Sequence, residues 1–123
     1  MKNRTEAARS AAKHVLYNAG LQMLMLAGHV AASAWVGAVS FGLIEGEIAP
    51  VGLVGLFFKA FAIAGVLWTP INAAGLYKRR SWARWSTMAY WALGFPLCCC
   101  LPLGLYGLWS LSRPEVRSLL DGE

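Results

Sequence analysis

Three long apolar stretches divide this chain, and almost every basic residue lies outside them. The stretches cover residues 19–44, 48–77 and 85–112. Each is longer than the roughly 20 residues that an α-helix needs to cross the hydrocarbon core of a bilayer. The sequence therefore predicts an all-α integral membrane helical bundle with three transmembrane helices, built as a single domain over residues 1–123.

The overall composition supports lipid, rather than water, as the solvent of this chain. Hydrophobic residues make up 58% of the sequence and charged residues 14%. Soluble domains average about 45–50% and about 25%. The net charge of +5 does not indicate nucleic acid, because the cations flank the apolar stretches, where they set topology and attract anionic headgroups. We expect membrane lipids as partners and no nucleic acid.

The distribution of charge between the two connectors predicts the orientation. The connector after the second stretch, with the first turn that follows it, carries Lys78, Arg79, Arg80 and Arg84, and four more cations precede residue 19. The first connector holds Glu45 and Glu47 and no Lys or Arg. Positively charged loops stay in the cytoplasm. We therefore expect a multi-pass protein of the inner (plasma) membrane with a cytoplasmic N-terminus.

The third apolar stretch is interrupted by Pro96 and Pro102. One kinked crossing over residues 85–112 is our main expectation, since the stretch is too short for two full crossings. The alternative is a re-entrant hairpin that gives four helical segments, and the two versions place the C-terminus on opposite sides of the membrane. Residues 1–18 also favour helix, either in the cytoplasmic interface or as an extension of the first span.

The C-terminal tail, residues 113–121, predicts a short amphipathic helix along the membrane surface. Ser112 and Glu115 have the spacing of a capping box, with Ser at the N-cap and Glu at N3. Val116, Leu119 and Leu120 follow at helical spacing.

Polar residues in the first stretch fall on one side of a helix. At about 100° per residue, all of them lie within an arc of roughly 60°; they are Asn18, Gln22, His29, Ser33 and Ser40. Matching polar faces occur on the later stretches at Thr69, Asn72 and Tyr90. Unpaired polar groups are costly in lipid, so this stripe predicts interhelical contacts, with a ligand path or a homo-oligomer interface as alternatives.

The apolar stretches also contain one lysine and a run of three cysteines. Lys59 is the one formal charge inside a stretch, and Glu45 and Glu47 are its expected ion-pair partners at the outer interface. Cys98, Cys99 and Cys100 are consecutive, which is not the spacing of a zinc site, and we expect them to be small packing residues. We expect no catalytic set, no metal and no cofactor.

The stretch from Lys78 to Leu120 resembles a pattern found in small uncharacterised bacterial multi-pass membrane proteins. The matching segments are residues 79–84 with the Trp-Ala-Arg turn, Phe95-Pro96, residues 104–109 with the G-x-Y-x-L-W ending, and residues 113–117. This chain departs from the pattern after Pro96, where it has Leu-Cys-Cys-Cys and many of those proteins have Gly-Thr. The resemblance implies a multi-helix membrane domain and no known activity.

A non-enzymatic role follows from this combination of polar-striped helices without catalytic residues. We expect an accessory or structural subunit of a membrane complex, or a homo-oligomer. A small transporter or channel module that uses the stripe of the first span is the alternative. A lipid or quinone binder is a further alternative.

Overall fold

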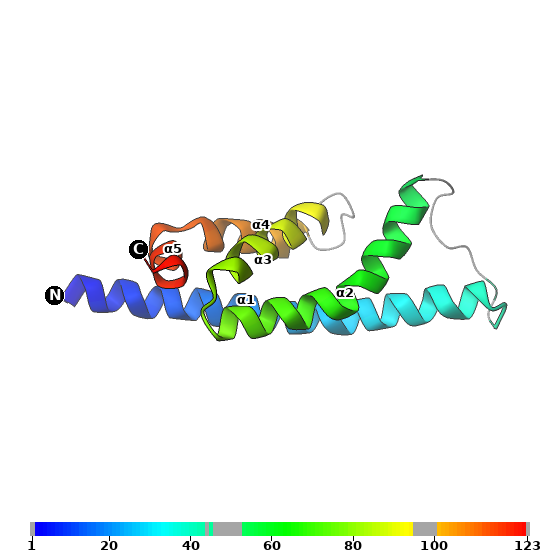
Figure 1. The fold of residues 1–123 in the computed structure, drawn as a ribbon, viewed down its shortest axis with the longest axis horizontal. Helices are drawn as coiled ribbons and strands as arrows, with labels where there is room; N and C mark the ends of the chain where they lie inside the picture. The colour runs from blue at the N-terminus through cyan, green and yellow to red at the C-terminus, as the bar shows by residue number, and fades with distance from the viewer. Residues whose placement is uncertain (1, 44, 46–52, 95–100, 123) are drawn as a thin grey trace.

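The computed structural model describes residues 2–43, 45, 53–94 and 101–122. In this part of the chain the secondary structure is entirely α-helical (Figure 1). Five helices follow one another: α1 (Lys2–Ser40), α2 (Leu53–Tyr77), α3 (Ser81–Gly94), α4 (Leu101–Ser112) and α5 (Pro114–Asp121).

Helix α1 is the longest helix, and α2, α4 and α5 pack against it. Its 39 residues give a length of about 58 Å at 1.5 Å per residue, and the helix runs along the whole long axis (Figure 1). The expected N-terminal helix over residues 1–18 is thus continuous with the first apolar stretch. The structure thus has one uninterrupted helix through both segments, as in the second of the two expected arrangements.

Helix α2 folds back along α1 and bends on the way. Pro70 lies inside this 25-residue helix, where it has no N–H to donate and its ring crowds the preceding turn. The first half of α2 projects away from α1, and the second half lies beside it (Figure 1). Both α1 and α2 are long and apolar enough to cross a membrane, a property that buried core helices and signal sequences share.

Helices α3 and α4 pack against each other as an antiparallel hairpin (Figure 1). Their 14 and 12 residues span only about 21 Å and 18 Å. Gly107 permits the contact, because a Cβ at this position would overlap the indole ring of Trp91. The expectation of one kinked crossing over residues 85–112 is therefore wrong, and the helices follow the alternative, a hairpin. Residues 95–100 at its tip lie outside the described residues.

Helix α5 covers the N-terminal part of α1 instead of lying free. Val116 and Leu120 are buried in one apolar cluster with Ala11 and Val15 of α1. The predicted capping box is wrong: Arg113 is the N-cap and makes no side-chain capping bond. Pro114 provides the N-terminal start, since its fixed φ already suits the first helical position.

Both described ends of the chain and the α2–α3 connector lie at the same end of α1 (Figure 1). The hairpin of α3 and α4 returns the chain to this end, where α5 then docks. Of the eleven Lys and Arg residues, all except Lys59 belong to this end, which we call the basic end. The opposite end contains the α1–α2 connector with Glu45.

Candidate functional site

The centre of the polar face of α1 is His29, which connects three helices. Its Nδ1 lies 3.1 Å from the carbonyl oxygen of Ala62 in α2, and its Nε2 lies 2.7 Å from the hydroxyl of Tyr90 in α3. A carbonyl oxygen only accepts hydrogen bonds, so neutral His29 carries its proton on Nδ1 and accepts a hydrogen bond from Tyr90 at Nε2. His29 and Tyr90 are 6% and 1% exposed, so the contact between them is buried.

Gly65 creates the space that His29 occupies. A Cβ at position 65 would overlap Cε1, Nδ1 and Cγ of the imidazole ring. The ring of Phe61 packs on the same imidazole, with 5.2 Å between ring centroids. Ser33, one turn further along α1, donates a second hydrogen bond of 3.1 Å to the Ala62 carbonyl. The helices α1 and α2 therefore meet here through a backbone carbonyl held by two side chains.

A second chain of hydrogen bonds runs from α1 through α2 to α3. Asn72 donates to Gln22 Oε1 at 3.3 Å and accepts from Ser86 at 2.6 Å. Ser86 in turn accepts from the indole N–H of Trp68 at 2.8 Å. Gln22 and Asn72 are both fully buried. Since every pair in this chain matches a donor with an acceptor, the amides are a structural bridge between the three helices.

The third contact of the polar face joins α1 to α4. Asn18 donates 2.8 Å hydrogen bonds to Ser110 Oγ and to the carbonyl oxygen of His14. Two side-chain atoms on neighbouring turns of this face, Asn18 Oδ1 and Gln22 Nε2, are buried and have no partner within the described part of the protein. One is an acceptor and the other a donor.

His14 extends the same face toward the basic end, and the sequence alone did not single it out. Its Nδ1 lies 2.9 Å from the Tyr106 hydroxyl, and Arg113 Nη1 lies 3.2 Å from its Nε2. Because a guanidinium only donates, His14 is neutral with its proton on Nδ1. Burial, and then the nearby charge of Arg113, lower the pKa of His14, while Glu115 raises it. The spacing of four residues between His14 and Asn18 places both on the same face of a helix, and this spacing could have added His14 to the predicted stripe.

The remaining residues predicted for this face make other contacts. Thr69 is buried and donates to the carbonyl of Gly65 in its own helix at 2.7 Å. Ser40 is exposed at the C-terminal end of α1. The structure thus brings four of the five stripe residues of α1 against other helices and leaves one outside.

The predicted outer ion pair is not formed between described residues. Lys59 is half-buried on α2, and no ion pair among the residues that the structure describes joins it to Glu45. Glu47 and Cys98, Cys99 and Cys100 lie outside the described residues. In the described ranges, no group of three or more His, Cys, Asp or Glu side chains could hold a metal ion.

The four cations predicted to face lipid headgroups divide into two kinds. Lys78, Arg79 and Arg80 are exposed, as expected for such contacts. Arg84 is 3% exposed and differs from that expectation, because its guanidinium binds both carboxylate oxygens of Asp121 in α5, at 3.3 Å and 2.8 Å. It also stacks on Trp85, 4.3 Å from the ring centroid. Arg84 therefore anchors α5 to α3.

Comparison with known proteins adds no assignment: no family model, no curated protein and no solved structure matches this chain. The resemblance drawn on residues 78–120 stays a prediction. The arrangement of the site itself is the basis for function. The bonds of Asn18 to Ser110, of Gln22 to Asn72 and of His29 to Tyr90 join neutral groups of different helices and are buried in the bundle.

Proposed function

We propose that this chain is a non-enzymatic integral membrane protein whose α1 and α2 cross the bilayer and whose α3–α4 hairpin enters it from the basic, cytoplasmic side. The apolar surface supports this arrangement. Leu24, Leu53 and Leu67 are 60%, 86% and 71% exposed, and they belong to a set of large exposed side chains on both long helices. A water-soluble protein rarely presents such a continuous apolar surface.

Amphipathic aromatic residues support a bilayer boundary near the basic end. Five tyrosine and tryptophan side chains there are between 48% and 73% exposed: Tyr17, Tyr77, Trp82, Trp85 and Trp109. Such rings concentrate at the headgroup level. Along α1, Trp35 is exposed at 47% toward the opposite end. The rise from Tyr17 to Trp35 is about 27 Å, close to the roughly 30 Å of a hydrocarbon core.

Lateral assembly is the role that the geometry supports best. Three glycines are required by packing within the chain, since a Cβ would overlap His29 at Gly65, Ala83 and Trp82 at Gly75, and Trp91 at Gly107. At Gly20 and Gly28 of α1, a Cβ would meet no atom within 4 Å. Glycine weakens a helix by about 1 kcal/mol relative to alanine. Packing within the chain therefore does not require glycine at these two positions. Close packing of α1 against a helix of another chain would explain them.

Gly20 belongs to an exposed surface that a second membrane helix fits, and Gly28 borders this surface one turn after Leu24. Spacings of four and three residues align an exposed seam on the back of α1, opposite the polar face; it contains Gly20, Leu24, Ala27, Ala31 and Ala34. Small residues in such a seam let two membrane helices approach closely. We therefore propose an accessory or structural subunit that packs through the α1 seam against a second copy or a larger membrane complex.

The polar face favours this structural role over transport. Asn18, Gln22 and His29 are at most 6% exposed and make hydrogen bonds to Ser110, Asn72 and Tyr90. Passage of a solute along this face would require these interhelical bonds to open. These hydrogen bonds hold the hairpin and α2 against α1, which is a structural role for the polar stripe.

Co-purification of the full chain in a mild detergent tests the proposal. The wild type is expected to carry a second copy or a membrane partner, and Ala27→Leu with Ala31→Leu is expected to release it, because the added methyl groups separate the two helices. Ala64→Leu is the matched control, since Ala64 is also exposed in the apolar part of α2 but outside the seam. A monomer without partners, or equal loss in the control, would contradict assembly through α1. Reporter fusions at both termini should place both in the cytoplasm, and opposite locations would contradict the re-entrant hairpin.

A further inference from the structure

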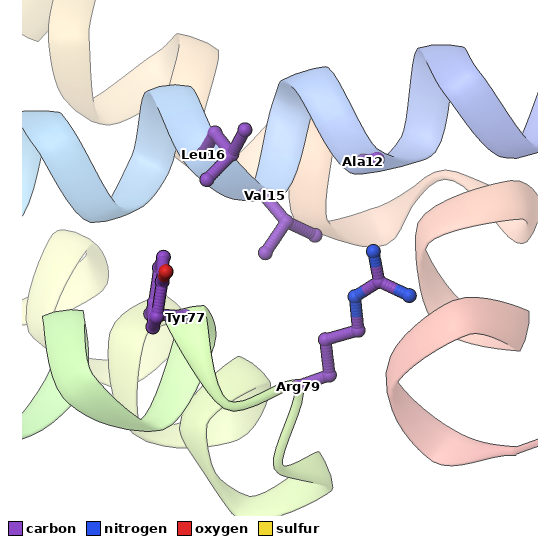
Figure 2. Close-up of a pocket in the computed structure, with 5 residues that line it drawn as sticks. All are labelled: Ala12, Val15, Leu16, Tyr77 and Arg79. Atoms are coloured by element: carbon purple, nitrogen blue, oxygen red, sulfur yellow. The ribbon is translucent and has the colours of Figure 1, made fainter.

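A pocket at the basic end lies between α1 and the α2–α3 connector (Figure 2). Its volume is about 300 Å³, at the small end of the range for ligand sites. The lining combines an apolar wall with one phenol and one guanidinium: Ala12, Val15, Leu16, Tyr77 and Arg79. Figure 2 shows the Arg79 side chain reaching from the connector toward α1, with Tyr77 on the other side of the pocket near Leu16.

The backbone at Arg79 holds this side chain in a conformation that favours glycine. The φ angle of Arg79 is +55°, and no other described non-glycine residue has a positive φ. The Arg79 N–H donates to Leu76 and the Arg80 N–H to Gly75, which closes α2 with a Schellman motif. Glycine is the usual residue at this position because a Cβ is unfavourable there. A side chain kept at such a position indicates a use for that side chain.

Like its exposed neighbours Lys78 and Arg80, Arg79 forms no ion pair with a carboxylate among the described residues, but of these three cations Arg79 alone lines the pocket. Arg84, Arg113 and Arg117 each form an ion pair with an acidic side chain of α5. None of the ion pairs between described residues includes Arg79, and its side chain is exposed. An arginine without an acid at the mouth of a pocket is suited to an anion, and its planar fork matches a phosphate group.

The position of the pocket along α1 indicates which kind of molecule carries the phosphate group. Tyr77, which lines the pocket, is 73% exposed and belongs to the aromatic belt at the proposed headgroup level. Leu16 is 53% exposed on the apolar side of the same wall. A phosphate in this place has an apolar surface directly next to it, which fits a lipid better than a free anion.

We infer that this pocket is a binding site for the headgroup of one acidic phospholipid of the cytoplasmic leaflet, with Arg79 as the ligand of its phosphodiester. The glycerol and the start of an acyl chain lie along Val15 and Leu16, and the Tyr77 ring borders the headgroup. The inference rests on the proposed membrane location and adds to it one lipid class, one site and one arginine among the several cations of this end.

The test uses the full chain in a neutral detergent at about 0.15 M salt, where the general attraction of basic residues for anionic surfaces is screened. Phosphatidylglycerol is titrated against phosphatidylcholine with the same acyl chains, and bound lipid is counted by native mass spectrometry. We expect saturable binding of one phosphatidylglycerol, weakened about tenfold in Arg79→Gln, the effect of one lost charge-assisted contact. Arg80→Gln is the matched control, with the same change of charge at a neighbouring exposed residue outside the pocket, and less than a twofold effect is expected.

Arg79→Gly separates binding from folding. It restores the residue that the Schellman position favours, so in lipid-free detergent the variant should unfold at the same temperature as the wild type or higher. Its phosphatidylglycerol affinity should nevertheless fall as in Arg79→Gln. Equal losses in the variants at positions 79 and 80, equal binding of phosphatidylcholine, or full competition by inorganic phosphate would each overturn the lipid site. A chain that fails to float with phosphatidylcholine vesicles would instead overturn the proposed membrane location, so the two failures are distinguishable.

Discussion

Replacement of Gly65 by alanine is the sharpest test of the packing between α1 and α2. A Cβ at this position would overlap the ring of His29, which is held at both nitrogens by Ala62 and Tyr90. The ring therefore has to leave its position and lose both hydrogen bonds. Overpacking costs about 1–3 kcal/mol, and two lost hydrogen bonds cost about 1 kcal/mol each.

Helix propensity acts in the opposite direction at this position. Alanine gains about 1 kcal/mol over glycine in a helix, so the net loss for Gly65→Ala is about 3 kcal/mol, or more than a hundredfold in the unfolding equilibrium. Unfolding by sodium dodecyl sulfate in mixed micelles, followed by tryptophan fluorescence, measures this free energy. Gly37→Ala is the control, because a Cβ there meets no atom within 4 Å. It should be neutral or slightly stabilising.

The double variant His29→Ala with Gly65→Ala identifies the contact itself. His29→Ala alone should destabilise the protein, because it leaves the Tyr90 hydroxyl without its partner on α1. In that background the methyl group added at position 65 enters the space left by the ring, and the helix propensity of alanine should stabilise the protein by about 1 kcal/mol. A coupling energy of about 4 kcal/mol is therefore expected between the two positions. A Gly65→Ala cost within about 0.5 kcal/mol of zero, or the same cost with and without His29, would refute the reasoning.

Two other predictions concern the basic end. Asp121→Asn should lower the free energy of unfolding by about 2–3 kcal/mol and release α5 to proteolysis, since it leaves the nearly buried Arg84 without its carboxylate; Glu6→Gln, an exposed acid on α1, is the control. The pKa of folded His14 lies below 6.5 because of burial and Arg113, so the unfolded chain binds more protons and stability should fall as the pH falls below about 6.5. His14→Asn should remove that slope between pH 7.5 and about 5, and an unchanged slope would contradict the assigned environment.

The sequence predicted the long apolar helices and most of the polar face for a physical reason. Hydropathy and the 3.6-residue period are properties of one helix, so Asn18, Gln22, His29 and Ser33 can be aligned without knowing what they face. Their partners could not be predicted, because Ala62 contributes a backbone carbonyl, which carries no sequence signal. Helical spacing also puts Gly65 on the same face as Thr69 and Asn72, but the close contact of Gly65 with the His29 ring depends on the packing of α1 against α2.

The hairpin shows why the third apolar stretch was misjudged. Length alone excludes two full crossings between residues 85 and 112, and this led to the expectation of one kinked helix. The structure resolves the conflict with two short helices that pair through Trp91 and Gly107. The prediction of a capping box was also wrong. Pro114 starts α5, and the hydroxyl of Ser112 donates to the carbonyl oxygen of Trp109 in α4 instead of capping α5.

The polar face of α1 holds the α3–α4 hairpin as well as α2. The α3–α4 hairpin is held against α1 by buried hydrogen bonds from Asn18 to Ser110 and from Tyr90 to His29. The Arg84–Asp121 ion pair connects α3 to α5. Because α1 uses one face for the hairpin and α2, its small-residue seam on the opposite face is exposed, and the proposed assembly through this seam is compatible with the internal packing.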